Sequence, residues 1–263
     1  MTRFRGNRRV ALLAAVAAGA LAALTACGGG SDPIAQPSHN VGFALDKPLP
    51  AAIRNLPLTK PDGTTTTLAA YAGEPVLIAD YLTLCTDICP MITANVVTAA
   101  RAIRADGYAG KIALLEITVD PHRDTAARMR AYQRLYGGPM PDWTLLRATP
   151  ADTAKLWQFF GVGYQRVKEG NPPDIDWLTH KPLTYDIAHT DAVLFLDASG
   201  HLRFVIDGSP NVQGKQPPAP LTRLLSREGI RNLRHPDQGV SWTVGQVLDV
   251  FSWLTNHRLA DPA

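Results

Sequence analysis

Short apolar runs alternate with segments of helical periodicity along most of the chain. The clearest run, residues 76–84, leads into Cys85 and Cys89 and then into a helical pattern over residues 91–105. A continuous apolar run of this length is typical of a strand buried on both faces, and a following segment without Gly or Pro favours a helix. Pro90 suits the first helical position, where its missing N–H costs nothing. The two cysteines are therefore predicted on a strand-to-helix turn.

The same alternation continues towards the C-terminus. We predict strands at 112–119, 143–147, 192–196 and 202–207, an extended segment at 164–169, and helices at 126–136, 151–160 and 244–254. Asp197 and Gly200 bound a hairpin turn between the last two strands. A β-α-β-α-β-α-β order followed by a hairpin and a helix implies parallel pairing with an antiparallel edge. A sheet of this kind between helices, with cysteines after its first central strand, is an α/β fold of the thioredoxin type.

Four segments lack a clear period. Residues 31–50 are rich in Pro, Ser and Gly and are predicted to be linker, whereas 56–67 contain a Lys-Pro-Asp-Gly turn and are predicted to form a small hairpin. Residues 170–182 are rich in Pro and Asp and are predicted to be a surface loop. Residues 209–234 hold four prolines and are assigned mostly to loop. The last two segments are the candidate loop insertions.

The N-terminus has the parts of a secretory signal, a basic start and an apolar core at residues 10–26. It ends in Leu-Thr-Ala-Cys, which resembles a bacterial lipobox with Cys27 as the lipidated residue. A plain signal peptide or an uncleaved anchor are the alternatives, although about 17 residues is the short limit for spanning a bilayer. We expect a signal peptide at 1–26, a flexible tether at 27–50 and a folded domain at 51–260. The protein would then be held at the extracytoplasmic face of a bacterial cell membrane.

Charge gives no indication of a nucleic-acid partner. The formal net charge of +3 comes from 26 basic and 23 acidic residues, and four of the basic residues are arginines of the leader. Without the leader the chain carries 22 basic residues against 23 acidic ones, and no basic tract is interleaved with aromatic residues.

The spacing of Cys85 and Cys89 allows more than one chemistry. Amide groups at a helix N-terminus stabilise a thiolate, which is both the nucleophile and the metal ligand. Residues four apart lie on one helical face with Cα atoms roughly 6 Å apart, which is within the range of a disulfide. With Cys27 lipidated, these are the two remaining cysteines. The pair is therefore a structural disulfide or inert thiols, a redox couple, or a metal site kept reduced by a partner.

Three motifs together resemble the SCO (SenC/PrrC-like) family over about residues 56–207. They are Cys85-x3-Cys89-Pro90, Thr-Val-Asp-Pro-His-Arg-Asp-Thr at 118–125, and Asp-Ile-Ala-His-Thr at 186–190 before the hairpin. The resemblance implies a membrane-tethered protein of thioredoxin-type fold. It also implies copper binding by Cys85, Cys89 and His189, in the service of the copper A centre of cytochrome c oxidase. Some members act mainly as thiol-disulfide reductants of that centre.

The chain departs from the family pattern at Thr86, where many members have proline. Asp87 is either a carboxylate ligand for Cu(II) or a solvated turn residue. Two thiolates and one imidazole suit Cu(I), whereas structural zinc usually takes four ligands. A histidine beside an apolar strand is often a core residue, so the ligand role of His189 rests on the resemblance. Met91 is expected to pack in the core, and the other histidines are expected at the surface: His39, His122, His180, His201, His235 and His257.

The leading functional hypothesis is an extracytoplasmic copper metallochaperone. Its cargo would be copper as Cu(I), with Cu(II) as a second option, passed to the oxidase subunit that carries the copper A site. An upstream copper donor or thiol reductant and the membrane surface would be its other partners. The alternative is a thiol-disulfide oxidoreductase in which Cys85 and Cys89 are the catalytic pair, and a cysteine peroxidase is a weaker third. No Ser-His-Asp arrangement or phosphate loop indicates another enzyme.

Overall fold

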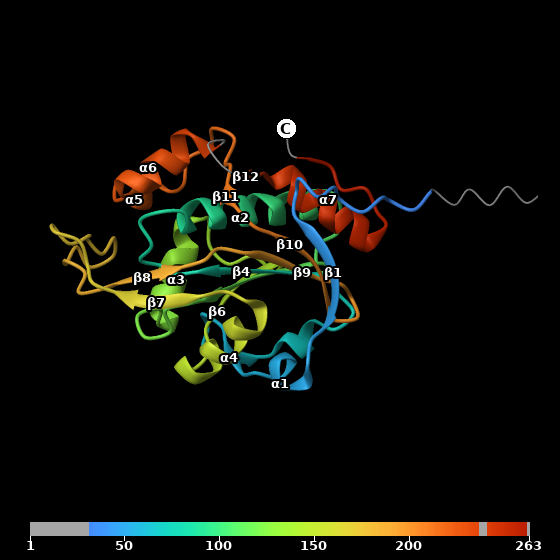
Figure 1. Ribbon diagram of the computed structural model, residues 1–263, viewed down its shortest axis with the longest axis horizontal. Helices are drawn as coiled ribbons and strands as arrows, with labels where there is room; N and C mark the ends of the chain where they lie inside the picture. The colour runs from blue at the N-terminus through green and yellow to red at the C-terminus, as the bar shows by residue number, and fades with distance from the viewer. Residues whose placement is uncertain (1–31, 237–240, 262–263) are drawn as a thin grey trace, which may run out of the picture. The chain divides into compact units, whose positions relative to one another are not determined.

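The computed structural model describes residues 32–236 and 241–261. The chain divides into two units, Met1–Asp32 and Pro33–Ala263, and all elements described below belong to the second unit. Cys27 and the predicted leader lie outside the described residues. The prediction of an α/β fold of the thioredoxin type is confirmed, because a central sheet lies between helices (Figure 1).

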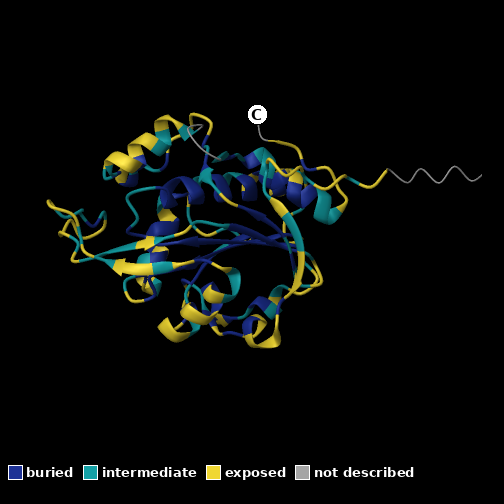
Figure 2. Cartoon of the chain, in the orientation of Figure 1, coloured by how far each residue is buried: buried dark blue, intermediate teal, exposed yellow. Residues whose placement is uncertain are grey.

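The central sheet has six strands in the order β1-β10-β9-β4-β5-β6. Its strands are β1 (Phe43–Pro48), β4 (Val76–Tyr81), β5 (Ala113–Thr118), β6 (Trp143–Leu146), β9 (Val193–Leu196) and β10 (His201–Ile206). Strands β4, β5 and β6 are parallel, β9 is antiparallel to β4, and β10 is antiparallel to β9. Strand β4 is buried at every position, as its apolar run predicted (Figure 2).

Helices cover both faces of this sheet. In Figure 1, α2 (Cys89–Ala105) and α7 (Val244–Thr255) lie on one face, and α1 (Ala51–Arg54) and α4 (Pro150–Phe160) lie on the other. Helix α3 (Ala126–Leu135) lies beside α2, where Tyr132 meets the Thr93 hydroxyl. Thr125, Thr149 and Thr243 cap α3, α4 and α7 by accepting a backbone N–H of the first turn.

Shorter elements surround this core. They are a small hairpin of β2 (Leu58–Thr59) and β3 (Thr65–Thr66), a 3-10 turn η1 (Leu68–Tyr71), an antiparallel ribbon of β7 (Tyr164–Val167) and β8 (Asp186–His189), a parallel pair of β11 (Ser209–Pro210) and β12 (Ser241–Trp242), and helices α5 (Ala219–Thr222) and α6 (Arg227–Arg234). The predicted hairpin at 56–67 is thus present. The extended segment at 164–169 is also present as β7, but it pairs with β8 rather than with the central sheet.

Two loop predictions are wrong. Part of the expected linker, Phe43–Pro48, is an edge strand that pairs with β10 and covers the edge of the hairpin. This strand is mostly solvent-exposed and ends at a proline, so it lacks the alternation that marks a half-buried strand. The segment 209–234, assigned mostly to loop, contains α5 and α6. Its four prolines all precede residue 221, and the proline-free part begins at Ser226, whose side chain caps α6 by accepting from Gly229 N–H.

The carboxyl group of Glu116 is buried inside the sheet. Glu116 of β5 is fully buried, and its two oxygens accept hydrogen bonds from Thr93 Oγ1 and Trp143 Nε1, each at 2.6 Å. Burial raises the pKa of Glu116 to about 7 in spite of these bonds, and the nearby Asp80 adds to the rise. The neutral acid is therefore the form that the fold favours.

We expect Glu116→Gln to stabilise the protein at alkaline pH. The folded pKa lies above the ordinary value of 4.5, so the contribution of Glu116 to stability is full below pH 4.5 and is lost as pH rises through about 7. Glutamine stays neutral and keeps one donor and one acceptor in place. Urea unfolding of both proteins at several pH values from 4.5 to 8.5 measures the effect. Parallel stability curves would contradict the assignment.

Candidate metal and thiol site

The two cysteines lie at the junction of β4 and α2, as the sequence predicts. Cys89 is the first residue of α2 and is fully buried, whereas Cys85 is only partly buried. The backbone N–H groups of Asp87 and Cys89 both donate to Cys85 Sγ, at 3.4 Å each. Both cysteines are free thiols in this structure. The amides of the helix start thus favour the thiolate of Cys85.

His189 ends strand β8 and comes to the cysteines from a distant part of the chain. Its Nε2 lies 3.6 Å from Cys89 Sγ. The ligand atoms of Cys85, Cys89 and His189 all lie within 4.8 Å of one another, which is close enough to hold one metal ion. The structure therefore brings together the three side chains that the resemblance selected.

The other nitrogen of His189 faces two carboxylates that sequence reasoning missed. Nδ1 lies 2.7 Å from Asp80 Oδ2 and 3.3 Å from Asp191 Oδ1. Asp80 is fully buried in β4, and its Oδ1 accepts from the Ala192 N–H at 3.0 Å. A carboxylate at Nδ1 keeps the proton there and turns Nε2 towards the sulfurs. A single charge within the apolar run 76–84 was the signal that could have identified Asp80.

Electrostatics make the two thiols unequal. A hydrogen bond from Cys89, helped by His189, lowers the pKa of Cys85 to about 6 against the effect of burial. Burial, together with the neighbouring Cys85, raises the pKa of Cys89 well above its ordinary value. Burial also disfavours the charged form of His189, but hydrogen bonds to Asp80 and Cys85 outweigh it and raise the pKa of His189 to about 11. At neutral pH the site therefore holds a Cys85 thiolate beside an imidazolium.

A cavity of about 390 Å³ opens onto these groups. Residues 85–88 of the cysteine loop form one side, and β8 with Asp191 forms another. Ser209, Glu228 and Asn232 complete the lining from the segment after the hairpin. Cys85 and His189 line this cavity, whereas Cys89 lies behind them. A ligand or partner thiol entering the cavity would meet Cys85 first.

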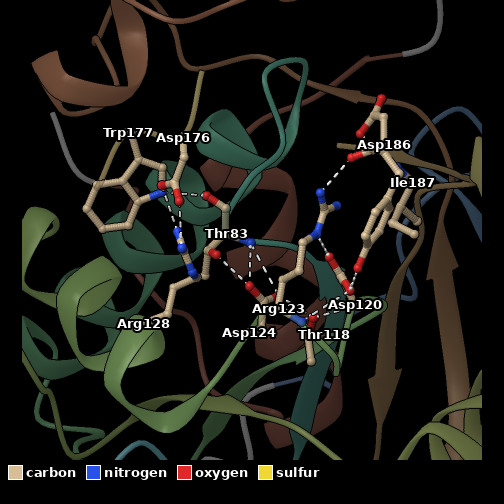
Figure 3. A network of polar contacts seen from close by, with 11 residues as sticks. Thr83, Thr118, Asp120, Arg123, Asp124, Arg128, Asp176, Trp177, Asp186 and Ile187 are labelled. Atoms are coloured by element: carbon tan, nitrogen blue, oxygen red, sulfur yellow. Dashed lines mark hydrogen bonds and ion pairs between the residues drawn. The ribbon is translucent and has the colours of Figure 1, made fainter. Parts of the chain in front are cut away.

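The motif at residues 118–125 is joined by hydrogen bonds to Thr83, which precedes the cysteine turn (Figure 3). Asp124 is fully buried and accepts from the N–H and hydroxyl of Thr83 and from the hydroxyl of Thr118. Trp177 Nε1 donates to the Thr83 carbonyl at 2.7 Å. Thr83 lies two residues before Cys85, so Asp124 and Trp177 fix the backbone segment that leads to Cys85.

The same motif also holds the strand that carries His189. Asp120 is ion-paired with Arg123, whose Nη1 donates to the Tyr185 carbonyl at 2.6 Å. The Arg123 guanidinium also stacks on the Tyr185 ring at 3.8 Å, and the guanidinium of Arg166 lies 3.7 Å from that ring. Tyr185 directly precedes β8. Residues 118–125 are thus structural supports for both halves of the site.

The remaining candidates have clear positions. Asp87 is not a free turn residue, because it accepts a hydrogen bond from the Ser226 hydroxyl and lines the cavity. Thr86 donates from its hydroxyl to Asp174 Oδ2 at 2.7 Å. Met91 is fully buried in the core, as expected. The other histidines are exposed or half-buried, also as expected: His39, His122, His180, His201, His235 and His257.

Comparisons with known proteins show what the chain is similar to. The SCO1/SenC family model matches residues 50–215, a range that contains Cys85, Cys89 and His189. A SCO1/SenC family lipoprotein from Bacillus anthracis is 18% identical, with a TM-score of 0.50, over 63% of this chain and 88% of that one. At this identity it shows the shared fold alone.

Two copper-bound structures are also similar. ScoI from Bradyrhizobium japonicum with copper bound is 26% identical over 70% of this chain and 99% of that one, with a TM-score of 0.48. ScoI from Arabidopsis thaliana with copper bound is 17% identical over 70% and 94%, also with a TM-score of 0.48. A comparison with the curated proteins gave no match.

We expect the two cysteines to alkylate at very different pH values. The reduced protein, treated briefly with iodoacetamide across pH 5 to 9, should label Cys85 with a midpoint near its pKa of about 6. Cys89 should remain unlabelled until well above pH 9, because its pKa is raised and its side chain is buried. Peptide mass spectrometry after digestion separates the two sites. Equal labelling of both cysteines at each pH would contradict the assigned asymmetry.

Proposed function

The chain belongs to the SCO1/SenC family, and on this premise we propose that it is a copper metallochaperone for the copper A centre of cytochrome c oxidase. The observation that carries the proposal is the group of two sulfurs and one imidazole nitrogen within 4.8 Å, beside an open cavity. The recipient would be the oxidase subunit that carries the copper A site. An upstream copper donor would supply the cargo.

The donor set suits copper in its reduced state. Cu(I) accepts low coordination by soft sulfur and by imidazole nitrogen. Asp80 and Asp191 lie on the Nδ1 side of His189 and leave Nε2 for the ligand role. Cu(II) prefers more nitrogen and oxygen ligands, and the same cavity is lined by four carboxylate residues, Asp87, Asp186, Asp191 and Glu228. Cu(I) is therefore the proposed cargo, with Cu(II) as a second state.

The residues of this chain have separate tasks in the proposed transfer. Cys85 is already a thiolate at neutral pH and faces the cavity, so it receives an incoming ion first. Cys89 and His189 bind after they release their protons, and Asp80 keeps the imidazole oriented meanwhile. Because the cavity stays open at Cys85, a thiolate of the recipient can replace one ligand at a time.

The proposal includes location outside the cytoplasm. We propose cleavage after residue 26 and lipidation of Cys27, which the basic and apolar leader supports. A similar protein from Bacillus anthracis is described as a lipoprotein. In the described part of the chain no helix is long and apolar enough to cross a membrane. The tether would run from Cys27 towards the folded unit, in which the Ile34 N–H donates to Asn256 Oδ1 and the first strand is β1.

The unequal thiols favour a second candidate function, thiol-disulfide exchange. The Cys85 thiolate would attack a partner disulfide and form a mixed disulfide with one partner sulfur. Cys89 would then displace that sulfur, which leaves the partner as a dithiol and this chain with a Cys85–Cys89 disulfide. Both electrons pass to the partner, and an upstream thiol reductant would restore the pair. A low pKa at the thiol that lines the cavity and burial of the other thiol are what an attacking and a resolving cysteine need.

Copper titration separates the two functions. The reduced soluble protein, titrated anaerobically with Cu(I) against a chromophoric chelator, should bind one ion per chain. Cys85→Ser and Cys89→Ser should abolish tight binding, and His189→Ala should weaken it by about tenfold or more. Cu(I) affinity that is indifferent to His189, with partner disulfide reduction lost in both serine variants, would favour exchange over copper delivery.

Proton release provides an independent check of the ligand set. At pH 7.5 Cys85 is mostly ionised, whereas Cys89 and His189 are protonated. Binding of one Cu(I) should therefore release about two protons, and His189→Ala should release about one at a pH high enough to ionise its Cys85, whose pKa the imidazolium no longer lowers. Calorimetry in buffers of different ionisation enthalpy counts these protons. An equal count in both proteins would exclude His189 as a ligand.

A further inference from the structure

Helix α6 lies directly on the cysteine loop, although it is outside the range that the family model matches. The Ser226 N–H donates to the Thr86 carbonyl at 2.9 Å, and the Ser226 hydroxyl donates to Asp87. A Cβ atom at Gly229 would collide with the Thr86 carbonyl and lie 3.0 Å from that of Asp87, so only glycine permits this approach. Helix α6 is thus fixed at the metal and thiol site by backbone contact.

The outer face of this helix carries three arginines, and Arg231 is ion-paired with Glu228 of the same helix, which leaves an excess of positive charge. Arg227, Arg231 and Arg234 are spaced by four and three residues, so they share one stripe, and all three are exposed. Ile230 is 38% exposed beside them and is one of the few large apolar side chains at the surface. The inner face holds buried Gly229 and half-buried Leu233. We call Arg227, Ile230, Arg231 and Arg234 the basic face.

The basic face is next to the entrance of the cavity. Glu228 and Asn232 of the same helix line that cavity together with Cys85 and His189. Figure 2 shows α5 and α6 as an exposed projection at the upper left of the molecule. A macromolecule that inserts a thiol or a copper ligand into the cavity must therefore contact α6. The positive charge of this face is a local feature, because the chain after the leader is nearly neutral, with 22 basic and 23 acidic residues.

We propose that the basic face is the docking surface for an acidic patch on the protein that exchanges copper with this site. The inference rests on the proposed function and adds the charge of the partner and the element that recognises it. Opposite charge across the contact would speed encounter and orient the partner's thiols towards Cys85. Ile230 would supply a small apolar contact at the centre of the arginines.

A protein fits this surface better than a membrane does. A helix that lies on a bilayer needs a broad apolar face, usually with several Trp, Phe or Leu residues. The leucines around α6, Leu225 and Leu233, are buried or half-buried against the domain, which leaves Ile230 outside. Anionic lipid remains a distinct outcome of the experiment below.

The test measures copper transfer and association as a function of salt. Full-length protein in phosphatidylcholine vesicles is loaded with Cu(I) and mixed with the reduced, copper-free soluble domain of the copper A subunit. The variant Arg227→Glu/Arg231→Glu/Arg234→Glu reverses the basic face. The control Arg134→Glu/Lys155→Glu/Arg258→Glu makes the same change in charge at exposed positions on other elements. Cu(I) affinity and near-UV circular dichroism establish that each variant is folded and loaded.

We expect wild-type transfer to slow by about tenfold between low and high salt, and reversal of the basic face to cause a similar loss at low salt. The control variant should transfer like the wild type. Association of the two copper-free proteins, followed by light scattering or NMR line broadening, should weaken in the same order. This second readout does not depend on copper.

Three results would overturn the inference. Equal transfer and association for the wild type and the basic-face variant would exclude α6 as the docking surface. Equal losses of transfer and association in the control variant would show that the effect comes from net charge and not from the basic face. An effect seen only when phosphatidylglycerol is added to the vesicles would assign the face to lipid. If the wild type binds no Cu(I), the proposed function fails, and the copper-free association still decides whether the basic face docks.

Discussion

The antiparallel pairing of β9 with β4 brings the two halves of the site together. Strand β4 carries Asp80 and leads to Cys85, and three residues separate His189 from the start of β9. Their register, from Val76 opposite Leu196 to Ala79 opposite Val193, places the residues before β9 beside the end of β4. Asp80 then joins both strands, since it accepts from Ala192 N–H and binds His189. A shift of one residue would move Asp80 to the other face of the sheet.

This pairing also determines the chemistry of the thiols. A histidine held by a buried carboxylate stays protonated beside Cys85, and the amides of the helix start act in the same direction. Burial and the neighbouring Cys85 raise the pKa of Cys89, which keeps its proton although His189 Nε2 lies 3.6 Å from its sulfur. The result is one reactive and one protected sulfur from residues only four positions apart. Such asymmetry serves both an ordered uptake of copper and an ordered exchange of disulfides, which is why the two candidate functions share one site.

The segments around the site distinguish this chain from a minimal α/β domain. The loop at 170–182 reaches the cysteine turn through Asp174 and Trp177, and α6 reaches it through Ser226 and Gly229. Both contact Thr86, since Asp174 accepts from its hydroxyl and the Ser226 N–H donates to its carbonyl. Hydrogen bonds from outside the loop therefore restrain a turn that proline would otherwise stiffen. The two segments are part of the site's architecture rather than unrelated surface additions.

The sequence by itself determined the elements whose signal is local. The buried strand before Cys85, the helix that begins beside Pro90 and the hairpin turn at Asp197 follow from apolar runs and turn chemistry. The order of three short motifs selected the candidate copper ligands Cys85, Cys89 and His189. No local rule places His189 near a sulfur.

Features that depend on contacts between distant segments were decided only by the tertiary structure. Strand β1 exists because β10 offers an open edge, and α6 is seated by its contact with Thr86. Asp80 looked like an isolated charge until the fold gave it His189 as a partner. Local sequence sets which backbone conformations cost little free energy. Whether an edge strand, a buried carboxylate or a closely packed glycine stabilises the fold depends on the surface that it contacts.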